Sequence, residues 1–141
     1  MIDTVGKLHP VLVHFPIAFL IGAAALESWA LVRRRSWSET GRVLAALGAV
    51  ACLGAVGTGL VHFRAGHYQG QLLDAALIHR ALGLGTLFAA LGAGALSRGS
   101  EPGALRIAGY RAALFASSAL VGLTGHYGGW LVFGWGRILT F

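Results

Sequence analysis

Six histidines are the residues of this chain with the widest choice of chemistry. They are His9, His14, His62, His67, His79 and His126. An imidazole binds haem iron or a transition metal through one ring nitrogen while the other nitrogen makes a hydrogen bond. No CxxCH segment occurs, so covalent attachment of haem is excluded, and Cys52 is the one cysteine, so no internal disulfide can form.

The spacing of the histidines bears on the kind of site they could build. His9 and His14 are five residues apart, as are His62 and His67. On a helix of 3.6 residues per turn this spacing rotates two side chains by about 140°, so the members of each pair do not share a face. A two-histidine zinc motif on one helix prefers a spacing of four. The pattern therefore favours ligands that come one from each of several helices.

Other catalytic chemistry is not indicated. There are no paired carboxylates, no nucleophile triad and no phosphate-binding loop. Glu27 is the one carboxylate inside an apolar run, and we expect it to pair with Arg33 or a neighbouring arginine. The net charge of +6 comes from short basic blocks between apolar runs, which does not indicate nucleic-acid binding. An electron-transfer or accessory subunit fits these features better than an independent enzyme.

The elements that must position the histidines are apolar helices. Hydrophobic residues make up 56% of the 141 residues and charged residues 11%, with a mean hydropathy of +0.71, so a lipid bilayer is the expected solvent. Four stretches reach the roughly 20 residues that cross a hydrocarbon layer. Short polar connections between them indicate antiparallel neighbours. The stretches are about Leu8 to Val32, Val43 to Phe63, Ala75 to Leu96 and Ile107 to Phe133.

These features predict the fold class. We predict an all-α, integral membrane four-helix bundle with up-and-down topology, formed by residues 1–141 as a single domain. Cytoplasmic loops carry an excess of lysine and arginine. One side has seven basic residues: Arg33, Arg34, Arg35, Arg42, Arg98, Arg106 and Arg111. The other has four: Lys7, Arg64, Arg80 and Arg137. The count predicts a multi-pass membrane protein with both termini, and all six histidines, toward the outer, non-cytoplasmic side.

Pairs of histidines across the bundle suggest a cofactor. In an up-and-down bundle the first and third helices are diagonal, so His14 can face His79, and His62 can face His126 in the same way. The second and third helices are also rich in glycine and alanine, which leaves room for a flat macrocycle. Our leading hypothesis is haem b, one or two molecules, with His14 and His79 as axial ligands. His62 and His126 form a second pair or support the first.

Residues around these pairs have expected roles. Arg80 and Arg64, with Lys7 and Arg137, could pair with the carboxylates of haem propionates. His9 precedes Pro10 and is interpreted as an interfacial residue that starts a helix, dispensable for haem. Pro16 has no N–H for the carbonyl of Leu12, which should loosen the helix close to His14.

Two further classes of function stay open. A structural or assembly subunit of a larger redox complex would use its histidines as polar contacts between helices. A zinc or copper site would use the imidazoles of His14, His79, His62 and His126 as metal ligands. For the haem hypothesis, a cytochrome or a quinol would be the redox partner.

Two stretches carry a family resemblance. LHPVLVHFPIAFL, at Leu8 to Leu20, and TGHYGGWLVFGWG, at Thr124 to Gly136, resemble the opening and close of a widespread family of small bacterial membrane proteins of unknown function. The likeness spans nearly the whole chain and includes a histidine early in the third helix, here His79.

The resemblance implies a four-helix fold in a bacterial inner (cytoplasmic) membrane, with the outer side facing the periplasm, and no settled activity. Members of the family often look like companions of cytochromes or other redox modules, which favours the haem hypothesis. The resemblance supports His9, His14, His79 and His126 more than the other two histidines. Many relatives have a histidine before the final glycine where this chain has Trp135, so a ligand role at that position is absent here.

Overall fold

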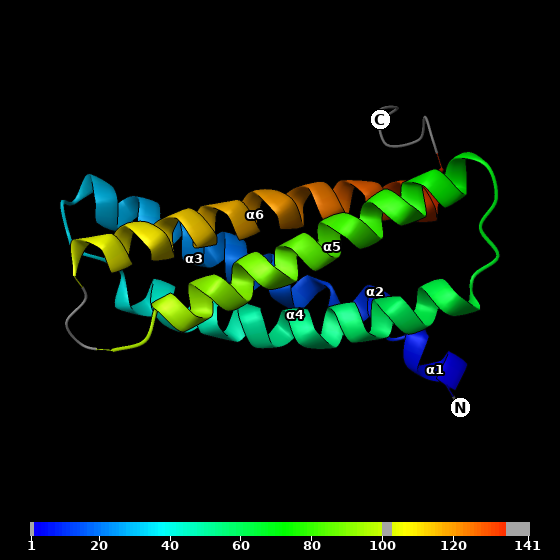
Figure 1. Cartoon of the computed structure of the whole chain (residues 1–141), viewed down its shortest axis with the longest axis horizontal. Helices are drawn as coiled ribbons and strands as arrows, with labels where there is room; N and C mark the ends of the chain where they lie inside the picture. Colours follow the sequence, from blue (N-terminus) through cyan, green and yellow to red (C-terminus); the bar gives the residue numbers. More distant parts are fainter. Residues whose placement is uncertain (1, 100–102, 135–141) are drawn as a thin grey trace.

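The bundle consists of four long antiparallel helices (Figure 1). The computed structural model describes residues 2–99 and 103–134. The long helices are α3 (His14–Val32), α4 (Glu39–Ala65), α5 (Gln71–Leu96) and α6 (Ala104–Phe133), and two short helices, α1 (Ile2–Gly6) and α2 (His9–Leu12), precede them. The predicted all-α four-helix fold is confirmed.

Each long helix packs mainly on its neighbours in the chain. Contacts join α3 to α4, α4 to α5 and α5 to α6, and α6 closes the ring against α3. The first and third spans are therefore diagonal, as are the second and fourth. Figure 1 shows α1 and the end of α6 at the same end of the bundle as the α4–α5 connection. We call this the histidine end, and the opposite end, with connections 33–38 and 97–103, the arginine end.

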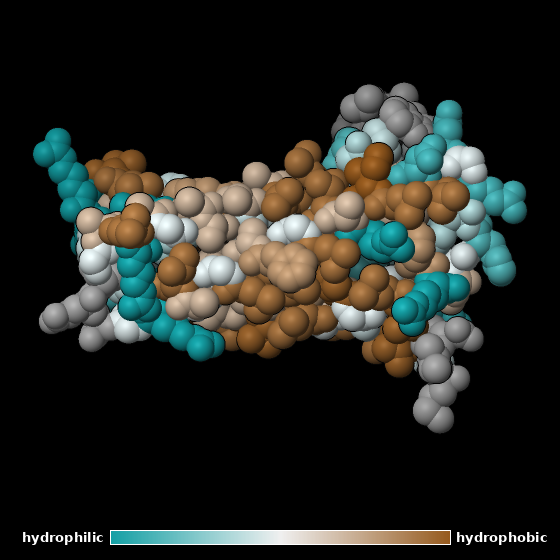
Figure 2. Space-filling view, in the orientation of Figure 1, coloured by the Kyte–Doolittle hydropathy of each residue, from teal (hydrophilic) through white to brown (hydrophobic). Residues whose placement is uncertain are grey.

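The surface and the interior have the composition of a membrane bundle. Four segments are long and apolar enough to cross a membrane: Thr4–Val32, Glu39–Ala65, Gln71–Leu96 and Ala104–Phe133. On the face seen in Figure 2, apolar side chains cover the middle of the bundle and polar side chains gather toward both ends. Large side chains such as Val50 (67% exposed) and Phe88 (70% exposed) point outward, whereas Ala45 and Ala90 are fully buried. Small residues inside let the helices approach closely.

The first span is interrupted, which differs from the single helix expected over Leu8 to Val32. Helix α2 ends at Leu12 and α3 begins at His14, with Val13 between them. Pro16 has no N–H to donate to the carbonyl of Leu12, so the regular hydrogen-bond ladder cannot continue there. The interruption lies directly beside His14.

The second span begins earlier than the expected Val43. Ser38 precedes α4, and its Oγ accepts a hydrogen bond of 3.0 Å from the N–H of Gly41. Such a cap satisfies one of the free N–H groups of a first turn. The first turn is polar, so hydropathy alone excluded it. The third and fourth spans likewise begin at Gln71 and Ala104, ahead of the apolar runs.

Charged contacts fasten the arginine end. Glu27 is fully buried and accepts hydrogen bonds of 2.9 Å from Arg111 Nε and from the N–H of Ser38. Arg111 also donates to the carbonyls of the 33–38 connection. Glu27 thus pairs with an arginine, as expected, but the partner is Arg111 of α6 and not Arg33. Arg33 instead stacks on the ring of Trp29, 4.6 Å from its centroid.

Candidate functional site

Three histidines meet at the histidine end. The ring of His9, on α2, lies 6.0 Å from the ring of His79, on α5, and 6.2 Å from the ring of His62, on α4, between centroids. The rings of His9 and His62 are nearly parallel, at 23°, and those of His9 and His79 are nearly perpendicular, at 83°. His9 and His79 are half-buried and His62 is exposed. We call these three residues the histidine cluster.

The ring of His9 is held by helix α4. Its Nδ1 lies 2.9 Å from the carbonyl oxygen of Ala55. A carbonyl only accepts hydrogen bonds, so Nδ1 carries the proton and Nε2 keeps a free lone pair. One turn further along α4, a Cβ at Gly59 would lie 2.8 Å from Cε1 of the ring. The imidazole therefore lies against bare backbone, in a space that exists because residue 59 has no side chain.

The ring of His79 is held by helix α6 in the same way. Its Nδ1 lies 2.9 Å from the carbonyl oxygen of Thr124. A Cβ at Gly128, four residues after Thr124, would lie 3.2 Å from Cε1 of the ring. Both imidazoles thus donate from Nδ1 to a helix carbonyl and pack on a glycine one turn later. Metal-bound histidines commonly donate their other ring N–H to such an acceptor, which fixes the tautomer with Nε2 available as a ligand.

The glycine beside His9 gives the first testable prediction. Gly59→Val should lower the free energy of unfolding by about 1–3 kcal/mol, because the added side chain overlaps the imidazole. Gly57→Val is the matched control, since a Cβ at Gly57 meets nothing within 4 Å, and its effect should stay within about 0.5 kcal/mol. Denaturant unfolding in detergent, followed by circular dichroism, measures both. Equal losses in the two variants would show that no close contact exists at residue 59.

Two predicted ligands lie outside the cluster. His14 is exposed, and its Nδ1 is 3.3 Å from the carbonyl of Val11 in its own span. His126 is exposed as well, and its ring packs 5.0 Å from Trp130 and 5.9 Å from Tyr127. Over the described residues, the expected ring pairs of His14 with His79 and of His62 with His126 are not formed. Since five residues separate His9 from His14, only one of them can face inward, and the structure turns His9 inward.

The arginines expected near propionates lie at the same end. The guanidinium of Arg80 sits over the ring of Phe63, 4.7 Å from its centroid, and Phe63 stacks on Tyr68 at 5.5 Å. Arg64 is exposed. His67 is exposed in the α4–α5 connection. The role expected of Arg137 falls on a position beyond the described residues.

A ready-made metal site is not found in the described part of the chain. Within residues 2–99 and 103–134, no group of three or more His, Cys, Asp or Glu side chains is arranged to hold a metal ion. Two rings with free Nε2 atoms suit an axial pair better than a closed tetrahedral site, which needs four ligands.

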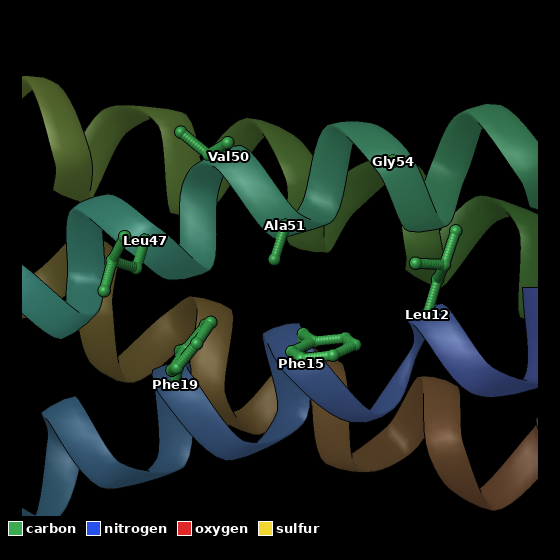
Figure 3. A pocket seen from close by; sticks show the side chains of 7 residues that line it. All are labelled: Leu12, Phe15, Phe19, Leu47, Val50, Ala51 and Gly54. Atoms are coloured by element: carbon green, nitrogen blue, oxygen red, sulfur yellow. The ribbon is translucent and has the colours of Figure 1, made fainter.

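An apolar groove runs between the first span and α4 (Figure 3). Its volume is about 260 Å³. All of its lining residues are apolar, so it offers no ligand to a metal and suits a lipid chain. They are Leu12, Phe15, Phe19, Leu47, Val50, Ala51 and Gly54.

Comparison with known families agrees with the fold. The model of a family described as "Predicted membrane protein (DUF2231)" matches residues 6–137. The chain belongs to this family. The match includes all three residues of the histidine cluster, three complete spans and the first span from residue 6 onward, so the four apolar helices agree with the description of the family as a membrane protein. Searches of curated proteins and of solved structures gave no match.

Proposed function

We propose that this chain is a membrane-bound haem b subunit that transfers electrons, with His9 and His79 as axial ligands. One observation carries the proposal: two half-buried imidazoles from diagonal spans meet at the same end of the bundle, each with Nδ1 bonded to a backbone carbonyl. The sequence alone favoured His14 in place of His9, so the proposal keeps the pair of spans and changes one ligand.

The donor set suits haem. A six-coordinate haem iron takes two neutral imidazoles, and both rings are held in the tautomer that leaves Nε2 free. Gly59 and Gly128 provide the space in which the rings lie. Arg80 and Arg64 are cations at the same end for the propionates, and His62 is the adjacent supporting group. When bound, haem would supply a reversible one-electron carrier.

The distribution of charge supports an orientation. Arg33, Arg34, Arg35, Arg98 and Arg106 gather at the arginine end, and such an excess is typical of the cytoplasmic side. The histidine end then faces the periplasm of a bacterial inner membrane. A periplasmic cytochrome or a membrane quinol can reach this end, and a larger membrane complex would bring such a partner close.

A structural role is the alternative that a specific observation favours. The same ring-to-carbonyl hydrogen bonds join α2 to α4 and α5 to α6. Polar contacts of this kind hold membrane helices together without any cofactor. In that case the chain is a scaffold or assembly subunit.

An absorption spectrum of the protein purified in detergent separates the two. We expect a sharp Soret band and, after reduction with dithionite, split visible bands typical of a bis-histidine haem b. A featureless spectrum from protein expressed with ample haem would overturn the proposal and leave the scaffold. Elemental analysis of the same sample then tests zinc and copper.

A further inference from the structure

A second hollow adjoins the histidine cluster, between the start of α5 and the end of α6. Its walls come from Gln71, Asp74, Ala75, Ile78, Tyr127 and Trp130. Ile78 immediately precedes His79, and Tyr127 immediately precedes Gly128, against which the ring of His79 lies. The walls of the hollow therefore include the sequence neighbour of His79 on α5 and the sequence neighbour of the glycine that its ring contacts on α6.

The hollow has one polar and one aromatic wall. Gln71 and Asp74 are three residues apart on α5, and Tyr127 and Trp130 are three residues apart on α6, so each pair lies on one face of its helix. The rings of Tyr127 and Trp130 meet edge to face, 4.9 Å apart. Among the described residues, the side chains of Gln71 and Asp74 make no hydrogen bond or ion pair. The polar pair is thus available to a ligand.

The size of the hollow limits what it can hold. Its volume is about 270 Å³. A cavity of roughly 150 Å³ holds one benzene ring, so this hollow takes a single substituted aromatic ring and is too small for a porphyrin. The site is therefore distinct from the place of the proposed haem.

We infer that this hollow binds the ring of a lipid-soluble hydroquinone. The Asp74 carboxylate accepts a hydrogen bond from a ring hydroxyl, the Gln71 amide donates to the second ring oxygen, and the aromatic wall packs on the ring. Ala75 and Ile78 supply the apolar floor that a membrane-dissolved ligand needs. A quaternary ammonium would also suit a carboxylate beside aromatic rings, but it cannot form a hydrogen bond with the Gln71 amide.

The role of the bound ring as electron donor rests on the proposed function. Oxidation of one hydroquinone to the quinone releases two electrons and two protons. The proposed haem would supply the one-electron acceptor, used twice for each hydroquinone, and the exposed Asp74 carboxylate would accept one proton while water accepts the other.

Binding of radiolabelled decylubiquinol tests the inference on the purified chain in lipid nanodiscs. We expect saturable binding above that of empty nanodiscs, weakened about tenfold or more by Asp74→Ala and clearly weakened by Gln71→Ala. Gln69→Ala is the matched control, because Gln69 is an exposed glutamine two residues away that does not line the hollow, and it should bind like the wild type.

Two results would overturn the inference. One is the absence of saturable binding, or equal binding in the Asp74 and Gln71 variants and the wild type. The other is displacement of decylubiquinol by tetramethylammonium, which would make the hollow a cation site. The haem spectrum of the same sample keeps the two proposals apart. Binding without haem bands removes only the proposed function, and haem bands without binding remove only the hydroquinone site.

Discussion

Replacing His79 with alanine is expected to abolish the Soret band and the split visible bands of the purified protein. The same loss is expected for His9→Ala, because each variant removes one of the two proposed axial nitrogens, which lie on diagonal spans. Haem content per mole of protein should fall more than tenfold in both variants. It is measured by absorbance after purification in the presence of added haem.

His14→Ala provides the decisive comparison. His14 is exposed and its ring does not contact the cluster, so this variant should keep its haem bands. His67→Ala, at an exposed position in the α4–α5 connection, controls for the loss of any imidazole. If His14→Ala lost haem while His9→Ala kept it, the ligand pair proposed from the structure would be wrong. Circular dichroism shows whether each variant is folded.

Glu27→Ala is expected to have the largest effect on stability. The side chain of Glu27 is fully buried and that of Arg111 is 20% exposed, so the variant leaves a largely buried arginine and the N–H of Ser38 without their acceptor. Breaking a buried ion pair in this way costs about 3–5 kcal/mol. The free energy of unfolding in mixed micelles measures the loss.

Glu39 offers the matched control for this prediction. It pairs with Arg42 at 2.8 Å, but its side chain is 76% exposed. Water reaches this carboxylate, and Arg42 keeps the carbonyls of Ser97 and Gly99 as acceptors, so Glu39→Ala should cost only about 0–1 kcal/mol. If both variants lost the same small amount, the burial of the Glu27 pair would contribute nothing to stability.

The sequence was sufficient to predict the four-helix fold and the diagonal placement of the first and third spans. Four apolar runs with short connections allow few arrangements, and the up-and-down order makes the first and third spans diagonal. The sequence did not show which of His9 and His14 faces the interior of the bundle. Their spacing shows that only one can face inward, but the interruption at Val13 sets the rotation of each part of the span, and this depends on tertiary packing.

Two further features depend on contacts between distant parts of the chain. Glu27 and Arg111 are separated by 84 positions, whereas Arg33 is close in sequence and was the natural expectation. The glycines of α4 were recognisable as small residues that favour close packing. That Gly59 makes room for an imidazole and Gly48 for the side chain of Leu20 follows only from the way the helices are placed.

The two ends of the bundle are joined by different forces. Both ion pairs of the described residues belong to the arginine end. There Arg42 and Arg111 also donate hydrogen bonds to carbonyls of the connections. The histidine end is closed by ring contacts and neutral hydrogen bonds, which break at lower cost. We therefore expect thermal separation of the helices to start at the histidine end, while the arginine end stays joined. If the proposed haem binds, this end is its expected route of insertion, without unfolding of the chain.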